Sequence, residues 1–213
     1  MPSLRQFFVT GTDTDVGKTY FSAWLIQTWR RQGKPAAALK PISCGDRLDA
    51  EILAAASEGD LSLDEVNPVQ LATPAAPLAA CRREGRTLDL PALAAQIARQ
   101  RQRWPRLLVE GVGGWRVPLT PQESIREWAV VLGLPVLVVA RAGLGTLNHT
   151  LLTIDSIRQT GLSCAGIILN AHDTPESPAR SMNPALLREA TGLPLLEFSG
   201  EVEASGQLPA WLD

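Results

Sequence analysis

The chain has 213 residues, 45% of them hydrophobic, and a formal net charge of −2. This length and apolar content predict one well-buried domain over residues 1–213, because no Ser/Gly-rich or charged linker divides the chain. The basic residues are scattered, apart from a cluster that we interpret as a solvated face: Arg99, Arg101, Arg103 and Arg106. A nucleic-acid partner is therefore not expected.

Neither a membrane segment nor an export signal is predicted. The longest apolar run, Ala129 to Ala140, is too short to cross a bilayer, and the N-terminus lacks a basic start followed by an apolar core. Cys44, Cys81 and Cys164 lie far apart without paired spacing, which disfavours a disulfide framework and a zinc site. A cytoplasmic location is expected.

Apolar runs alternate with amphipathic, helix-length segments, which predicts an α/β fold with three layers: a mostly parallel sheet with helices on both faces. The expected strands, in chain order, are Gln6–Gly11, Ala36–Pro41, Arg106–Gly111, Pro135–Ala140, Cys164–Asn170 and Leu193–Phe198. The expected helices are Lys18–Gln32, Leu48–Ala56, Leu90–Gln102, Ser124–Val131, Thr146–Thr160 and Asn183–Thr191. The stretch Leu71–Ala80, rich in proline and alanine, is expected to be a long surface loop or lid.

The first strand leads into "GTDTDVGKTY", which resembles a phosphate-binding loop with one residue too many. Five residues separate Gly11 from Gly17, where the usual loop has about four. Because a strand precedes this loop and a helix follows it, its backbone N–H groups are expected to face an anion. Lys18 would then bind terminal phosphates and Thr19 would bind Mg²⁺. The alternative is a polar turn with a chance Gly-Lys-Thr.

Lys40 ends the second strand and is a candidate second cation beside this loop, although a lysine at a strand end is often a solvated charge. Asp46 and Asp49 follow it, and Mg²⁺ usually takes one or two carboxylates in addition to waters and phosphates. Either aspartate could instead cap the helix that begins near Leu48, and capping is our preferred interpretation of Asp46.

The third strand ends with Glu110, followed by Gly111, Gly113 and Gly114. A carboxylate after an apolar strand, in a chain with a phosphate loop, is typical of a site that holds Mg²⁺ directly or through water. The glycines would let the backbone approach a ligand closely. The alternative is a capping carboxylate in a glycine turn.

Two later segments carry weaker signals. Ala142–Thr150 follows a strand and opens a helix, so its N–H groups form a second potential anion site. We interpret His149 and His172 as packing or surface residues. Asn170, in "ILNAHD", resembles the asparagine with which GTPases read guanine, but Ala171 replaces the following lysine. A carboxamide can also read adenine, so the base stays open.

Taken together, residues from about Phe7 to Asn170 resemble the dethiobiotin synthetase family, most specifically in GTDT-x-VGKT and VEG-x-GGW. The resemblance implies a P-loop NTPase-like fold and a homodimer that uses ATP and Mg²⁺. It also implies a ligase that closes a cyclic urea on 7,8-diaminononanoate and CO₂. The family's reaction passes through a carbamate and a carbamic-phosphoric anhydride and releases ADP and phosphate.

The resemblance further implies roles for individual positions. The expected catalytic residues are Lys18, Lys40 and Thr14. The expected nucleotide contacts are Asp13, Thr14, Asp15, Val16, Gly17, Lys18, Thr19, Tyr20, Glu110 and Asn170. The expected substrate contacts are Lys40, Cys44, Gly113, Gly145, Thr146 and Asn148, the last three capturing the substrate carboxylate across the dimer interface. The expected metal ligands are Thr19, Asp49 and Glu110.

One residue and one segment depart from the family pattern. Cys44 stands where the family often has serine, which replaces a hydroxyl contact by a weaker thiol. The tail, residues 197–213, lacks a Gly-Glu-x-Pro segment that lies next to the nucleotide in some members.

Two other classes remain as alternatives. A partitioning-type ATPase carries a signature lysine early in the loop, where this chain has Asp13. A non-catalytic dimer is disfavoured because the candidate cations and metal ligands are all present. Both comparisons favour the ligase.

Overall fold

The computed structural model describes residues 5–172, 174–200 and 207–213. Its centre is a six-stranded parallel sheet in the order β2-β5-β1-β6-β7-β8. The strands of this sheet are β1 (Arg5–Gly11), β2 (Ala36–Leu39), β5 (Arg106–Gly114), β6 (Val136–Arg141), β7 (Cys164–Asn170) and β8 (Leu195–Phe198). A separate two-stranded parallel sheet joins β3 (Ile42–Cys44) to β4 (Val69–Leu71).

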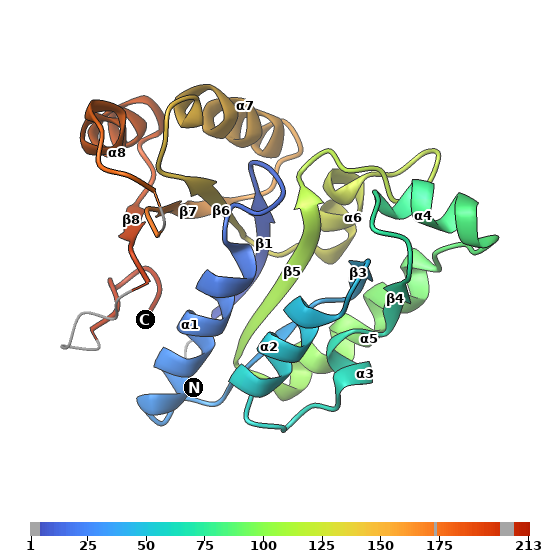
Figure 1. Cartoon of the computed structure of the whole chain (residues 1–213). Coiled ribbons are helices and arrows are strands. Elements are labelled where there is room, and N and C mark those ends of the chain that lie inside the picture. The colour runs from blue at the N-terminus through green and yellow to red at the C-terminus, as the bar shows by residue number, and fades with distance from the viewer. Residues whose placement is uncertain (1–4, 173, 201–206) are drawn as a thin grey trace.

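Helices cover both faces of the sheet, as predicted for a three-layer fold. The helices are α1 (Lys18–Arg31), α2 (Leu48–Ala56), α3 (Leu63–Val66), α4 (Pro77–Glu84), α5 (Leu90–Arg103), α6 (Ile125–Leu132), α7 (Thr146–Arg158) and α8 (Pro178–Thr191). In Figure 1, α1 and α2 lie in front of β1 and β5, and α6 lies behind them. Because the strands are parallel, their carboxyl ends meet at one edge, where the predicted motifs gather.

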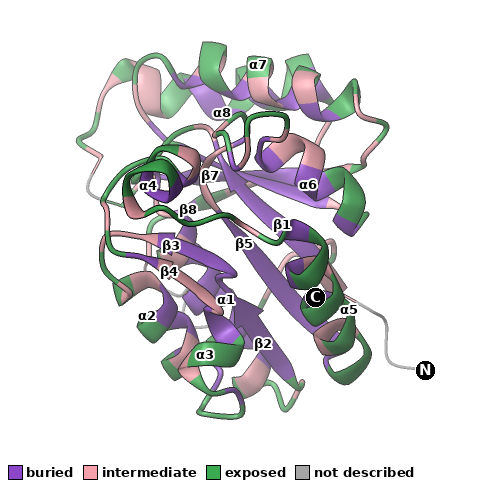
Figure 2. Ribbon diagram, turned by 90° about the vertical axis from the view of Figure 1, so that its right-hand side faces the viewer, coloured by how far each residue is buried: buried purple, intermediate pink, exposed green. Residues whose placement is uncertain are grey.

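The strands are apolar along their length because both faces of the sheet are covered. In Figure 2 the central strands are buried over most of their length, whereas the outer surfaces of the helices are exposed. The ring of Phe8 in β1 packs edge-on against Trp128 of α6 with centroids 6.3 Å apart. On the opposite side, Trp29 of α1 is fully buried.

Some predicted boundaries were wrong, one of them at the site itself. β2 ends at Leu39, one residue before Lys40, whose N–H donates to Val66 O at 2.9 Å and not to a strand. The expected loop Leu71–Ala80 is shorter than predicted, because α4 begins at Pro77, and proline is favoured in the first turn of a helix. α8 also begins earlier than expected, since Ser177 caps it by accepting from Arg180 N.

The interpretation of the arginine cluster as a solvated face was wrong for two of its members. Arg106 lies in β5 and is buried, with its guanidinium 6.0 Å from the ring centre of Trp29. Arg101 donates to Leu132 O at 2.8 Å and to Gln6 Oε1 at 3.1 Å. Both side chains therefore join helices and strands within the fold.

The segment 207–213 packs across the end of the sheet opposite the phosphate loop. Trp29 Nε1 donates to Leu212 O at 2.9 Å, and Arg5 Nε donates to Asp213 O at 3.2 Å. The rest of the tail that departs from the family pattern includes residues 201–206, which lie outside the described residues. Across the part of the chain that is described, no helix has the length and apolarity needed to cross a membrane.

Candidate active site

The extra residue of the phosphate loop is accommodated by one unusual backbone conformation. Asp15 has φ 55°, a left-handed value that is uncommon for a residue other than glycine. The loop is tied together locally: Thr14 N donates to Asp13 Oδ1 at 2.7 Å, and Lys18 Nζ donates to Asp13 O at 3.3 Å. Arg141, at the end of β6, donates to Asp15 O at 3.0 Å. The loop therefore closes around Lys18 without losing the Gly17 turn into α1.

Lys40 lies at the centre of an ionic cluster in which Lys40 and Glu110 are buried and Asp49 is half-exposed. Its Nζ donates to Glu110 Oε1 at 2.7 Å and to Asp49 Oδ2 at 2.8 Å. Thr19 Oγ1 donates to the same Glu110 oxygen at 2.7 Å. The predicted cation, which follows β2, is thus brought together with the predicted metal ligands of α1, α2 and β5.

The pKa values of the two lysines shift in opposite directions. Burial is the main cause that lowers the pKa of Lys18, and the neighbouring charge of Lys40 adds to it, while Glu110 opposes it. Burial also acts on Lys40, but the carboxylates of Glu110 and Asp49 outweigh it and raise the pKa of Lys40. For Asp49, burial is outweighed by Lys40, so its pKa lies below the ordinary value. Lys40 is therefore held charged, and Lys18 is the lysine that loses its proton first.

One carboxylate oxygen of the ionic cluster has no hydrogen-bond partner among the described residues. Glu110 is completely buried, and its Oε2 makes no hydrogen bond. An unpaired buried carboxylate oxygen is costly unless a cation or donor completes it. No cluster of three or more His, Cys, Asp or Glu side chains suited to a metal occurs among the described residues. Thr19, Asp49 and Glu110 nevertheless fit Mg²⁺, which is commonly held by one or two carboxylates, with phosphates and waters completing its shell.

The ionic cluster opens into a cavity of about 730 Å³ at the carboxyl edge of the sheet. The predicted site residues that line it are Thr14, Asp15, Gly17, Lys18, Thr19, Tyr20, Lys40, Cys44, Asp49 and Gly113. Burial raises the pKa of the Cys44 thiol to about 11, so it is a neutral wall of the cavity at neutral pH. The sequence favoured Asp46 as the N-cap of α2, and this was wrong: the N-cap is Arg47, and its side chain makes no capping hydrogen bond. Asp46, one residue earlier, accepts from Leu48 N at 3.1 Å.

The predicted substrate residues of α7 lie apart from this cavity. Gly145 has φ 90° and precedes the helix, Thr146 is buried, and Asn148 is exposed. Thr146 lines a smaller cavity of about 150 Å³ together with Asp13 and Arg141 on the other side of the phosphate loop. Within the described part of one chain, α7 and Lys40 do not share a cavity.

Asn170 is a support of the phosphate loop. It is buried, its Nδ2 donates to Val16 O at 3.0 Å, and its Oδ1 accepts from His172 N at 3.1 Å. Its amide also fills the space where a side chain at Gly17 would stand, so only glycine fits that turn. Tyr20 stacks on His172 with ring centres 4.8 Å apart. The predicted base contact of Asn170 stays a prediction.

Arg141 is the residue of this region that the sequence analysis missed. It is exposed and ends β6 beside the phosphate loop, where it donates to Asp15 O. Its position at the carboxyl end of a parallel strand could have identified Arg141, because the same criterion singled out Lys40 and Glu110.

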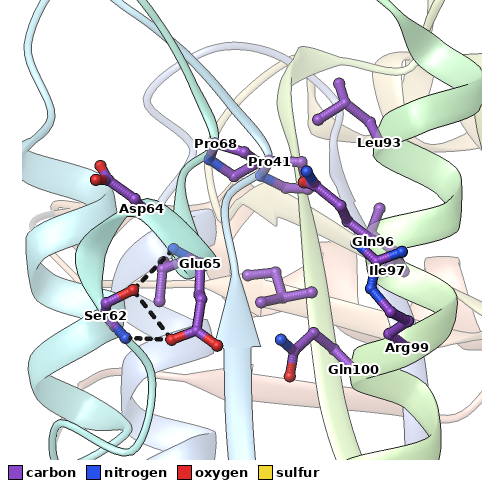
Figure 3. A pocket seen from close by; sticks show the side chains of 12 residues that line it. Pro41, Ser62, Asp64, Glu65, Pro68, Leu93, Gln96, Ile97, Arg99 and Gln100 are labelled. Atoms are coloured by element: carbon purple, nitrogen blue, oxygen red, sulfur yellow. Dashed lines mark hydrogen bonds between the residues drawn. The ribbon is translucent and has the colours of Figure 1, made fainter.

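A further hollow lies between α3 and α5, beside the edge strand β2. Its volume is about 290 Å³, and its floor includes Pro41, Leu93 and Ile97 (Figure 3). Ser62 and Glu65 at its rim are occupied with each other in a capping box. None of the predicted site residues lines this hollow, so it is separate from the ionic cluster.

Comparisons with known proteins agree with the geometry. Residues 5–210 match the family model described as an AAA domain. The chain is 40% identical to the ATP-dependent dethiobiotin synthetase of Akkermansia muciniphila, with 91% of each chain covered. It is 45% identical to that of Anaeromyxobacter sp. (strain K), with 88% of this chain and 86% of the relative covered.

Solved structures at lower identity support the fold. The septum site-determining protein MinD of Pyrococcus horikoshii, complexed with Mg-ADP, has a TM-score of 0.59 at 18% identity, over 92% of this chain and 82% of that one. The cell division protein FtsY of Thermotoga maritima has a TM-score of 0.58 at 16% identity, and the match covers 92% of this chain and 61% of that one. With the identity and coverage of the curated relatives, the chain belongs to the ATP-dependent dethiobiotin synthetase family.

Proposed function

We propose that the chain, acting as one ligase domain over residues 1–213, forms the cyclic urea of dethiobiotin from 7,8-diaminononanoate and CO₂ at the expense of ATP. The observation that carries the proposal is the buried Lys40 ammonium, held between Glu110 and Asp49 in the same cavity as Lys18 of the phosphate loop. A carbamate and a triphosphate are both anionic, so their approach requires such preorganised positive charge and no strong base.

Each group has a proposed task. Lys18 and the loop N–H groups hold the terminal phosphates, and Lys40 orients the carbamate oxygen toward the γ-phosphorus. Thr14, on the lining of the same cavity, contacts the carbamate or the γ-phosphate. Mg²⁺ held by Thr19, Asp49 and Glu110 would neutralise charge on the phosphates. After phosphoryl transfer, the second amine attacks the carbamoyl carbon and phosphate leaves, which closes the ring.

The remaining contacts are proposals of the same kind. Cys44 and Gly113 line the cavity and would bound the diamine. In a homodimer, the carboxylate of the substrate bound by the partner protomer would be held by Gly145, Thr146 and Asn148. This role is consistent with the separation of these residues from Lys40 within one chain. A cytoplasmic location is part of the same proposal.

The decisive experiment is mass spectrometry of the purified protein incubated with Mg²⁺, ATP, the diamine and isotope-labelled bicarbonate. Dethiobiotin carrying the label in its ring carbonyl, together with ADP and phosphate, is expected. ATP turnover that ignores the diamine and gives no urea product would overturn the proposal in favour of a nucleotide-dependent switch.

The metal site has a separate test. Glu110→Gln should weaken Mg²⁺ binding in the presence of ATP by about tenfold or more, because the amide removes the charge of the proposed ligand. Asp46→Asn, at a carboxylate that lines the same cavity, is the matched control and should leave that affinity unchanged. Calorimetric titration measures both; equal affinities in the wild type and Glu110→Gln would remove Glu110 from the metal shell.

A further inference from the structure

The backbone of Lys40 is held from outside the main sheet. β2 pairs with β5 up to Leu39, and Lys40 follows that last pair. Its N–H donates to Val66 O at 2.9 Å, and its carbonyl accepts from Asn67 Nδ2 at 2.6 Å. The position of this lysine therefore depends on the connection between α3 and β4.

Asn67 uses both ends of its side-chain amide. Its Nδ2 also donates to Val69 O at 3.1 Å, while its Oδ1 accepts from Ser43 Oγ and Arg47 Nε, each at 3.0 Å. An arginine nitrogen only donates, so the amide oxygen must be the atom that faces Arg47. Asn67 is 1% exposed, so these four contacts face little competition from water.

The contacts of Asn67 join the two segments that meet in the ionic cluster. Arg47 immediately precedes α2 and donates a second hydrogen bond to Asn67 O at 2.8 Å. Asp49, two residues later, is the carboxylate 2.8 Å from Lys40 Nζ. Pro41 and Pro68, which follow Lys40 and Asn67 in the chain, lie next to each other in Figure 3. Asn67 thus connects the end of β2 with the start of α2.

We propose that Asn67 is a positioning residue for the ligase reaction, because it sets where the Lys40 ammonium lies relative to Asp49 and Glu110. This inference rests on the proposed function. The inference goes beyond that function because it makes the Asn67 amide, which does not line the active-site cavity, responsible for the position of the Lys40 ammonium. A displacement of about 1 Å at a reacting centre can cost on the order of 10²-fold in rate, so loss of this contact should be visible in kcat.

Asn67→Asp is the sharpest variant. It keeps the shape of the side chain and the acceptor contacts to Ser43 and Arg47, but it sets a carboxylate oxygen against the Lys40 carbonyl. We expect kcat for dethiobiotin formation, counted per nucleotide-binding site, to fall about 10- to 100-fold. The dissociation constant for ATP should stay within about twofold of the wild-type value, because Lys18 and the loop are untouched. A purely structural role would lower the number of binding sites and leave kcat per site unchanged.

Ser57→Ala is the matched control. Ser57 is also buried, and its Oγ accepts from Ala38 N of β2 at 3.2 Å. It does not contact the ionic cluster. The substitution should lower the melting temperature and leave kcat per site unchanged; a loss of kcat equal to that of Asn67→Asp would overturn the specific role of Asn67.

The remaining outcomes separate this inference from the proposed function. Wild-type protein that makes no dethiobiotin overturns both. Wild-type protein that makes it, with unchanged kcat in Asn67→Asp, overturns the positioning role alone. If Asn67→Asp does not fold, Asn67→Ser takes its place, because serine is too short to reach the Lys40 carbonyl; the same fall is expected, and an unchanged kcat overturns the inference.

Discussion

At the scale of the residue, the ionic cluster combines two demands on Lys40. Its ammonium balances the buried carboxylate of Glu110, and in the proposed reaction it also orients the carbamate. Breaking a buried pair by removing one partner leaves an uncompensated charge, which typically costs roughly 3–5 kcal/mol. Catalysis and stability are therefore coupled at this side chain.

Lys40→Gln should abolish ring closure while ATP still binds, because Lys18 and the loop remain. It should also lower the free energy of unfolding by roughly 3 kcal/mol, since Glu110 stays buried without its cation. Product analysis, ATP titration and urea unfolding measure the three effects. Lys34→Gln, at an ion pair with Asp213 on the surface, is the control and should leave all three nearly unchanged. Unchanged turnover in Lys40→Gln would remove Lys40 from the site.

The lowered pKa of Lys18 predicts that nucleotide binding depends on pH. The pKa of Lys18 in the free protein lies below the ordinary 10.5, mainly because of burial, so on raising the pH it loses its charge before Lys40 does. The affinity for ATP should therefore fall on the alkaline side before pH 10.5, while Lys40, with its raised pKa, stays charged. Lys18→Arg should remove this decline, because a guanidinium stays protonated there. ATP titrations from neutral to alkaline pH test it; the same decline in Lys18→Arg would assign it to another group.

At the scale of the element, β7 carries a contact that fixes the C-terminal segment. A Cβ at Gly166 would stand 2.5 Å from Trp211 Cζ3 and 3.0 Å from Pro194 O. Gly166 therefore lets the Trp211 ring approach the strand closely, near the buried contact between Trp29 and Leu212.

Gly166→Ala should lower the free energy of unfolding by about 1–3 kcal/mol, the usual cost of overpacking. In a Trp211→Ala background the same substitution should cost less, because the ring that makes the closest contact is gone and only the contact with Pro194 O remains. Denaturant unfolding of the four proteins measures this coupling. Equal costs in both backgrounds would show that Trp211 does not limit the space at Gly166.

At the scale of the whole molecule, α7 and the loop before it present apolar side chains to solvent. Leu144 is 96% exposed and Leu152 is 62% exposed, and Leu152 lines a cavity with Thr14 of the phosphate loop. Exposed apolar side chains beside a proposed shared site are consistent with a homodimer joined through α7.

Sedimentation should show a dimer, and Leu152→Asp should shift it to the monomer by placing a charge in the interface. Val131→Asp on α6 is the control, because Val131 is similarly exposed at 65%. If Leu152→Asp stays dimeric, the interface lies elsewhere.

The sequence by itself determined the strands of the main sheet, the longer helices between them and the candidate active-site residues, but it missed β3, β4, α3 and α4. Apolar runs specify buried parallel strands, Gly-Lys-Thr specifies a phosphate loop, and the carboxyl ends of such strands must meet at one edge, so Lys40 and Glu110 could be predicted as neighbours. The family was likewise recognisable from the loop and from the strand end at Glu110.

Tertiary structure decided the features that depend on contacts between distant segments. Lys40 lies outside β2 because Val66 and Asn67 compete for its backbone, and Asn170 supports the loop because its amide packs against Gly17. Arg106 is buried because Trp29 of α1 lies against it. The pattern of residues along the chain indicates burial and periodicity. The positions of these three side chains depend instead on partners that come together only when the sheet and its helices pack.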